Sequence, residues 1–144
     1  MATGQEPGES VVRIVAAVVL DAMGRVLLVR KQGTRAFMQP GGKREPGESD
    51  LAALARELRE ELGCALDPTS ARFLGTARAP AANEPGNLVE AALYAVRVSG
   101  PVLAAAEIAE LLWLDPCAPD GIILAPLTRD QVLPRLRRAQ DAVP

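Results

Sequence analysis

Residues 42–64, GKREPGESDLAALARELREELGC, decide the fold of this chain because they predict a helix with a marked start and a marked stop. Ser49 and Asp50 can cap the first turn, since short polar side chains accept hydrogen bonds from its free N–H groups. No glycine, proline or β-branched residue occurs from 51 to 62, and Gly63 follows as a stop. We therefore predict a helix that begins near Ser49 and ends at Leu62.

This helix is expected to have one apolar face and one acidic face. At about 100° per residue, one face collects the apolar side chains of Leu51, Leu54, Ala55, Leu58 and Leu62. Glu57, Glu60 and Glu61 fall together on another face, where like charges repel. A divalent cation such as Mg²⁺, which takes carboxylate and phosphate oxygens as ligands, would relieve this repulsion. The alternative is the solvated acidic face of an ordinary amphipathic helix.

The spacing of the whole stretch resembles the signature of the Nudix hydrolase family, the MutT-type pyrophosphohydrolases. That signature is G-x5-E-x7-R-E-U-x-E-E-x-G-U, where U is apolar. Its positions in this chain are Gly42, Glu48, Arg56, Glu57, Leu58, Glu60, Glu61, Gly63 and Cys64. The family usually has Ile, Leu or Val at the last position, and a buried cysteine behaves as a small hydrophobic residue. The resemblance implies an α+β domain, an α/β/α sandwich around a mixed sheet with this stretch as loop–helix–loop.

The same resemblance implies an activity, which is the metal-dependent hydrolysis of a pyrophosphate bond in a nucleoside diphosphate linked to another group. Glu57, Glu60 and Glu61 would hold Mg²⁺ or Mn²⁺, and either Glu60 or Glu107 would take the proton of the attacking water. Some Nudix-like domains instead sense a nucleotide or bind a protein without hydrolysis, and this is the alternative function. The complete set of acidic residues favours the enzyme, since non-catalytic members are expected to lose them.

Residues just before the helix are expected to shape the site. The run Pro40-Gly41-Gly42-Lys43 is also typical of the Nudix family. Glycines let the backbone approach a ligand closely, so the carbonyl of Gly41 or Gly42 is a candidate metal ligand, and Lys43 is a candidate phosphate contact. A plain turn is the alternative. Structural roles are expected for Gly42, Glu48, Arg56 and Gly63, with Glu48 and Arg56 pairing to hold the loop against the helix.

A further glutamate is expected near a strand that contains Trp113. Glu107 stands six residues before Trp113, which resembles a Nudix segment in which such a glutamate is a metal ligand or the general base. Glu110 and Glu90 are the alternatives, and any of the three can be a surface residue.

The substrate-binding residues are less marked in the sequence. Arg30 and Lys31 end a strand and can face a phosphate. Phe37 is our first candidate for stacking on a base, and Met38 and Tyr94 are weaker ones. Pro80, sixteen residues after Cys64, resembles the marker of ADP-ribose-cleaving members. The small size fits equally well members that hydrolyse oxidised nucleoside triphosphates.

The remaining elements follow from periodicity and turn residues. Residues 11–20 form a nearly continuous apolar run, which predicts a strand buried on both faces. The short turn at 21–24 predicts a hairpin between this strand and residues 25–30. We also expect a loop at 64–70, antiparallel strands at 71–80 and 88–98, a short strand at 111–114, and a helix at about 129–139 capped by Thr128.

Length and composition limit the function classes. A chain of 144 residues predicts one domain, at 11–144, after a disordered tail at 1–10. The net charge of −2 speaks against binding a nucleic acid polymer, so a small nucleotide is the expected partner. The absence of histidine excludes Ser-His-Asp catalysis and His-ligated zinc. Without an apolar span, signal peptide or disulfide framework, a cytoplasmic protein is expected, and a homodimer is possible.

Overall fold

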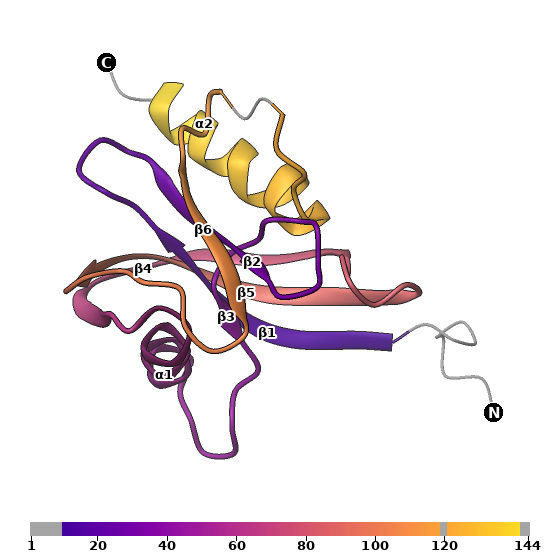
Figure 1. The fold of residues 1–144 in the computed structure, drawn as a ribbon, viewed down its shortest axis with the longest axis horizontal. Helices are drawn as coiled ribbons and strands as arrows, with labels where there is room; N and C mark the ends of the chain where they lie inside the picture. Colours follow the sequence, from indigo (N-terminus) through magenta and orange to yellow (C-terminus); the bar gives the residue numbers. More distant parts are fainter. Residues whose placement is uncertain (1–9, 119–120, 142–144) are drawn as a thin grey trace.

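The computed structural model describes residues 10–118 and 121–141 of the chain (Figure 1). Within these residues it contains, in chain order, β1 (Ser10–Val19), β2 (Val26–Lys31), β3 (Gly41–Gly42), α1 (Asp50–Leu62), β4 (Ala65–Pro80), β5 (Asn87–Ser99), β6 (Ile108–Leu114), a π-helical turn (Thr128–Val132) and α2 (Leu133–Asp141). Most of the tail expected at residues 1–10 lies outside the described part, and Ser10 belongs to β1. No helix within the described residues has the length and apolar character needed to cross a membrane.

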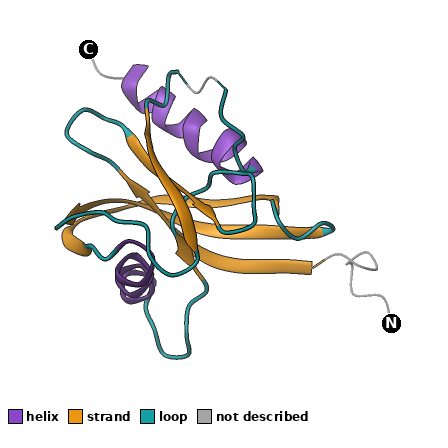
Figure 2. Cartoon of the chain, viewed as in Figure 1, coloured by secondary structure: helices purple, strands orange, loops and turns teal. Residues whose placement is uncertain are grey.

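The strands form a mixed sheet and a second, smaller sheet between two helices. The larger sheet has the order β3-β1-β5-β4, in which β1 runs parallel to β5 while β4 runs antiparallel to it. The smaller sheet pairs β2 with β6 in antiparallel fashion. Helix α1 lies on one side of the strands and α2 on the other (Figures 1 and 2). The expected α/β/α sandwich around a mixed sheet is therefore confirmed.

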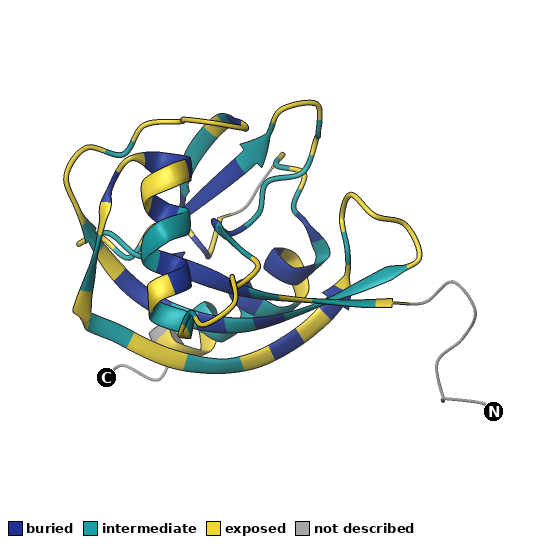
Figure 3. Cartoon of the chain, turned by 90° about the horizontal axis from the view of Figure 1, so that it is seen from below, coloured by how far each residue is buried: buried dark blue, intermediate teal, exposed yellow. Residues whose placement is uncertain are grey.

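Strand β1 lies at the centre because it is apolar on both faces. Val15, Ala17 and Val19 belong to a hydrophobic cluster that also contains buried residues of α1. The alternate residues Ala16 and Val18 belong to a second cluster that is closed by the C-terminal helical segment. Successive side chains of a strand point to opposite faces, so a continuous apolar run has to be covered twice. Figure 3 shows buried and exposed residues alternating along the long strands and α1.

The predicted boundaries of α1 are confirmed by both caps. The Ser49 hydroxyl accepts a hydrogen bond from the Ala52 N–H at 3.1 Å. Gly63 ends the helix in the left-handed conformation with φ 68°, and its N–H donates to the Arg59 carbonyl. A residue with a Cβ resists that conformation, which explains why glycine follows the last helical residue. Leu54, Leu58 and Leu62 are fully buried against the sheet, as the apolar stripe predicts.

Two predictions about the strands are wrong. Residues 11–20 and 25–30 do not form a hairpin, because β2 pairs with β6 and only one isolated bridge, Leu20–Val26, joins the two segments. The expected loop at 64–70 lies largely within the long strand β4, which begins at Ala65. Its pairing with β5 is interrupted between Asp67 and Arg72, so the Asp-Pro pair marks a bulge in the strand rather than a loop.

The C-terminal helix is present but begins differently from the prediction. Thr128 does not cap it; the residue is fully buried, and its hydroxyl donates to the side chain of Gln39. A π-helical turn occupies Thr128–Val132, and α2 follows from Leu133. Pro134 is thus the second residue of α2, but it lies inside a continuous helical run from 126 to 141. The π-helical turn directly before it is the kind of irregularity that a proline inside a helix is expected to cause.

Candidate active site

The consecutive glycines Gly41 and Gly42, the second of which opens the motif, lie where side chains do not fit. A Cβ on Gly41, whose φ is 147°, would collide with the Val15 carbonyl oxygen of the neighbouring strand. A Cβ on Gly42 would lie 2.5 Å from the nearer carboxylate oxygen of Glu57. Glycine at both positions therefore lets β3 pair with β1 and lets the Glu57 carboxylate rest against the backbone of the loop.

Glu48 and Arg56 form the expected pair between loop and helix. The Arg56 Nε and Nη2 atoms donate to the two carboxylate oxygens of Glu48 at 2.7 and 2.8 Å. Arg56 also donates to Glu57 Oε1 at 2.7 Å and to the Lys43 carbonyl at 3.0 Å. Hydrogen bonds from Arg56 and from the Glu45 N–H lower the pKa of Glu48 to about 2. The pair thus fixes the loop, the helix and the Glu57 side chain together.

The three glutamates of the helix occupy different environments. Glu61 is buried, with 4% of its surface exposed, and the Gly41 N–H donates to its Oε1 at 3.3 Å. Burial and, after it, the negative charge of Glu57 and a hydrogen bond with that residue raise the pKa of Glu61 to about 8. The Glu60 side chain is 56% exposed and lies 3.6 Å from Arg56. Among the described residues, no three acidic or cysteine side chains are already gathered as a metal site.

The site nevertheless fits a hard divalent cation at Glu57 and Glu61. Glu61 is buried next to Glu57, and burial together with the negative charge of Glu57 raises the pKa of Glu61 even though Arg56 is bonded to Glu57. A divalent cation between the two carboxylates would offset this repulsion. Carboxylate oxygens are the ligands that Mg²⁺ and Mn²⁺ prefer. Glu60 is one residue away on the same helix, but in this structure its side chain points toward Arg56 and solvent.

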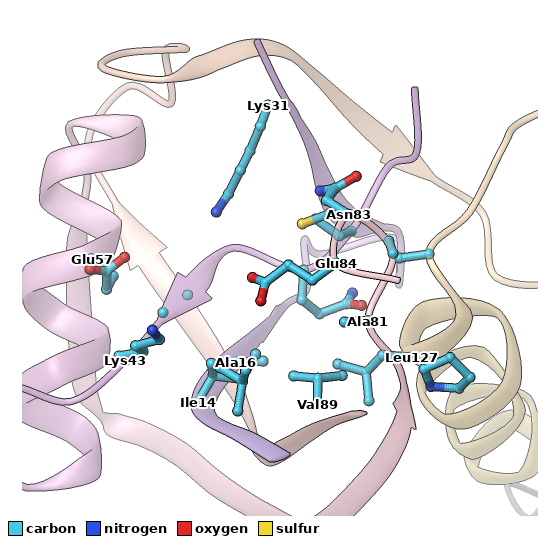
Figure 4. Close-up of a pocket in the computed structure, with 18 of the residues that line it drawn as sticks. Ile14, Ala16, Lys31, Lys43, Glu57, Ala81, Asn83, Glu84, Val89 and Leu127 are labelled. Carbon is cyan, nitrogen blue, oxygen red and sulfur yellow. The ribbon is translucent and has the colours of Figure 1, made fainter. Parts of the chain in front are cut away.

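A cavity of about 390 Å³ opens beside the Glu57 carboxylate (Figure 4). Its polar end is lined by Lys31, Gly41, Gly42, Lys43, Glu57 and Glu107. Its apolar end is lined by Val12, Ile14, Ala16, Val89 and Leu127, and residues 80–84, around the start of the β4–β5 connection, form another wall. Figure 4 shows Glu57, Lys31 and Lys43 on one side, with Val89 and Leu127 on the other. We call this space the central cavity.

Glu107 lies at the polar end of the central cavity, whereas the two alternative glutamates do not. The Glu107 side chain is 63% exposed, and its Oε1 lies 3.6 Å from Lys31 Nζ. Glu110 is bound to Arg30 at 2.6 Å, outside the cavity. Glu90 lies between Arg13 and Arg78 on the exposed part of the larger sheet.

Three residues predicted to bind substrate lie away from the central cavity. Arg30 donates to Glu110 and to the Thr34 carbonyl, and its neighbour Lys31 lines the cavity instead. Phe37 lies near the 121–124 segment, where its backbone pairs with Ile123 and Ala125. Tyr94 donates from its hydroxyl to Asp50 at 2.6 Å, and its ring packs on Phe73 with centroids 5.1 Å apart. Of the predicted contacts, Lys31, Met38 and Lys43 line the cavity.

Other residues of the cavity wall were missed by sequence reasoning. Gln39, Asn83 and Glu84 bring amide and carboxylate groups to the wall. The signal for Gln39 was its place directly before the Pro-Gly-Gly run. Asn83 and Glu84 lie in a hairpin connection, and such loops often carry binding residues, but nothing in the spacing showed which wall the loop would form.

The carboxylates and lysines at one end of the cavity are groups that can bind a divalent cation and phosphate oxygens. The sequence model of the NUDIX domain family matches residues 11–136. The chain therefore belongs to the NUDIX family. The pyrophosphohydrolases among its relatives make it a hydrolase of this family.

Three relatives illustrate the similarity. The chain is 31% identical to the CTP pyrophosphohydrolase of Escherichia coli over 117 residues, which covers 78% of this chain and 81% of that protein. It is 44% identical to the RNA pyrophosphohydrolase of Halorhodospira halophila over 64 residues, but the match spans only 34% of that longer protein and 44% of this chain. The crystal structure of a MutT NUDIX hydrolase from Burkholderia pseudomallei superposes with a TM-score of 0.68 at 25% identity, covering 88% of this chain and 96% of that one.

Proposed function

We propose that this chain hydrolyses nucleoside triphosphates, and related nucleoside diphosphate derivatives, at a pyrophosphate bond, with Mg²⁺ or Mn²⁺ as cofactor. One observation carries the proposal: a single cavity joins Glu57 at its polar end to an apolar wall formed by β1 and β5. Phosphates placed beside Glu57 put the base against Ile14 and Val89. A small nucleotide is the partner that a cavity of this size accepts.

The size of the central cavity favours triphosphates over substrates with two large groups. Its volume of about 390 Å³ lies near the lower end of the roughly 300–1,000 Å³ typical of small-molecule sites. One nucleoside with its phosphates fills such a space, and a second sugar or nucleoside would extend out of it. The similarity over most of its length to a protein named CTP pyrophosphohydrolase supports the same choice.

The residues of the polar end suit the chemistry of phosphoryl transfer. A bound Mg²⁺ or Mn²⁺, held by Glu57 and Glu61 with Glu60 nearby, would offset the negative charge that builds on the phosphate oxygens. Lys31 and Lys43 add positive charge at the same end of the cavity. They would bind phosphate oxygens and hold the reacting phosphorus in one position.

Glu107 is the proposed general base. Its carboxylate would accept a proton from a water molecule while the water oxygen attacks phosphorus. The bond from phosphorus to the bridging oxygen then breaks, and that oxygen leaves with the departing phosphate group. Lys31, 3.6 Å from Glu107, would orient this carboxylate beside the phosphates.

Nucleotide hydrolysis with and without metal tests the proposal. The substrates are normal and oxidised nucleoside triphosphates, nucleotide sugars, ADP-ribose and dinucleoside polyphosphates, with products separated by chromatography. We expect activity with Mg²⁺ that EDTA abolishes, and a loss of about a hundredfold or more in kcat for Glu61→Gln and Glu107→Gln. Glu110→Gln is the matched control, because Glu110 lies three residues further along and outside the cavity.

Two outcomes would contradict this proposal. Full activity of Glu61→Gln would show that the assigned metal site is wrong. Nucleotide binding without hydrolysis of any substrate would replace the enzyme with a nucleotide-sensing domain.

A further inference from the structure

Gln39 is a buried side chain whose amide is only half satisfied. Only 7% of its surface is exposed, and it lines the central cavity. Its Oε1 accepts a hydrogen bond at 2.5 Å from the hydroxyl of Thr128, which is fully buried. Its Nε2 has no hydrogen-bond partner, and it is the one buried side-chain nitrogen or oxygen in the described residues without a partner.

The orientation of this amide follows from the distance to Thr128. A separation of 2.5 Å is that of a short O–H···O hydrogen bond and is shorter than ordinary N–H···O bonds. The oxygen end of the amide therefore faces Thr128, and the nitrogen end, with two N–H donors, is left over.

The backbone around Gln39 is firmly held. Met38 exchanges two backbone hydrogen bonds of 2.8 Å with Val29, and the Pro40 carbonyl accepts from the Ala17 N–H at 2.9 Å. Gln39 thus stands between a bridge to β2 and a bridge to β1. With its oxygen tied to Thr128 as well, the amide is presented in one orientation, which is what a selective hydrogen bond requires.

A donor left unpaired in a protein interior is unfavourable, and most buried polar groups have a partner. We propose that the Nε2 group of Gln39 recognises a hydrogen-bond acceptor on the base of the bound nucleotide, a carbonyl oxygen or an unprotonated ring nitrogen. This inference rests on the proposed function, because it places a base in the central cavity. Nε2 is covered in the free protein, so a side chain of the cavity wall has to shift when the nucleotide binds, as often happens at binding surfaces.

The chemistry predicts selectivity for the base. Gln39 offers donors toward the base, because its oxygen faces Thr128. Bases differ in where they present carbonyl oxygens, ring nitrogens and amino groups. A base that places an amino group at this position would leave two donors facing each other. The wild-type protein should therefore prefer some bases over others, and Gln39 should account for part of that preference.

The test compares the four common bases as nucleoside triphosphates with Mg²⁺, using wild type and Gln39→Met. Methionine keeps the length of the side chain and removes the donor. For the preferred base we expect kcat/KM to fall about tenfold, through KM, while the poorer bases change by less than about threefold. Gln32→Met is the matched control, because Gln32 is exposed and directly follows the end of β2. This variant should keep the wild-type preference among the bases.

A second variant covers the possibility that Gln39→Met does not fold. Gln39→Met/Thr128→Val replaces both partners of the hydrogen bond with apolar groups, which is close to neutral for stability. It should show the same reduced difference in kcat/KM between the preferred base and the poorer bases. If the variants keep the wild-type order of bases, Nε2 makes no selective contact with the base and the inference is wrong.

Equilibrium binding separates this inference from the proposed function. Titration calorimetry with nucleoside monophosphates, without metal, measures base preference in the absence of catalysis. If no triphosphate is hydrolysed but monophosphates still bind with a preference that Gln39→Met removes, the proposed function fails and the inference stands. Hydrolysis with an unchanged preference in Gln39→Met overturns the inference and leaves the function standing. Absence of any nucleotide binding overturns both.

Discussion

Arg56 donates hydrogen bonds to both oxygens of the Glu48 carboxylate, with an Nε–Oε2 distance of 2.7 Å and an Nη2–Oε1 distance of 2.8 Å. Two parallel charged hydrogen bonds of this kind fix the orientation of both side chains. The remaining nitrogen, Nη1, donates to Glu57 at 2.7 Å. The loop before α1 and the first carboxylate of the site are therefore held by one guanidinium, so loss of the pair should affect both stability and activity.

The first prediction concerns stability in acid. Arg56 lowers the pKa of Glu48 from 4.5 to about 2 in the folded protein. A lowered pKa means that the pair stabilises the fold above about pH 4.5, and that this contribution is lost as the pH falls toward 2. Glu48→Gln removes the titrating group, so its melting temperature should be lower at pH 6 and should approach that of wild type as the pH falls from about 4.5 to 2.

Thermal melts at a series of pH values measure this difference. Glu45→Gln is the matched control, because Glu45 is 3.5 Å from Arg56 but 63% exposed. Screening by solvent should leave its melting curve close to that of wild type. A constant gap between Glu48→Gln and wild type at every pH would show that the pair does not titrate as described.

Gly42→Ala should damage the site more than the fold. A Cβ at this position would meet the Glu57 carboxylate at 2.5 Å, so that side chain has to move. A misplacement of about 1 Å at a catalytic group can cost about a hundredfold in rate. We expect kcat to fall by about that factor, while circular dichroism keeps the wild-type spectrum. Gly33→Ala is the comparison: no atom lies within 4 Å of its added Cβ, but its φ of 74° strains an alanine, so it should lose some stability and keep kcat. Equal losses of kcat in both variants would contradict the steric argument.

Local sequence signals predicted α1 and its caps, since Ser49, the unbroken run of helix formers and Gly63 each act within a few residues. The apolar run at 11–20 likewise predicted a strand covered on both faces. Strand pairing was the part that failed, because the partner of β2 lies about eighty residues further along, in β6. A short turn after β1 suggested a hairpin between β1 and β2. No local signal showed that β2 would pair with β6 instead.

In the site, too, contacts between residues close in the sequence were predictable and contacts that depend on long-range pairing were not. The pairing of Glu48 with Arg56 was predictable from the resemblance, and Lys43 lies at the cavity as expected. Phe37 and Tyr94 were chosen for their aromatic character, but which side of a sheet they occupy depends on register. The Gln39–Thr128 contact joins residues 89 positions apart, so no spacing rule could have found it.

Lys31 and Arg30 should differ sharply in their effect on catalysis although they are neighbours. Lys31 lines the central cavity, whereas Arg30 is engaged by Glu110 and the Thr34 carbonyl outside it. Lys31→Met should lower kcat/KM about tenfold to a hundredfold, because a charge that faces the phosphates is lost. Arg30→Met should stay within about threefold of wild type. The reverse order would return Arg30 to the substrate site and remove Lys31 from it.

Tyr94→Phe should affect stability and leave catalysis intact. The Tyr94 hydroxyl donates to Asp50 Oδ2 at 2.6 Å, while Arg44 donates to Oδ1 of the same carboxylate at 2.6 Å. This arrangement ties β5 to the first turn of α1. Burial and the Asp50 carboxylate raise the pKa of Tyr94 to about 12, so the hydroxyl keeps its proton at every pH used for assay.

Loss of this one hydrogen bond should lower the free energy of unfolding by about 1 kcal/mol in urea denaturation. Because the ring contact with Phe73 lies outside the central cavity, kcat/KM should stay within about twofold of wild type. Phe73→Leu is the companion variant: it removes the ring contact and keeps the hydroxyl, so it separates packing from hydrogen bonding. A tenfold rise in KM for Tyr94→Phe at unchanged stability would place Tyr94 at the substrate after all.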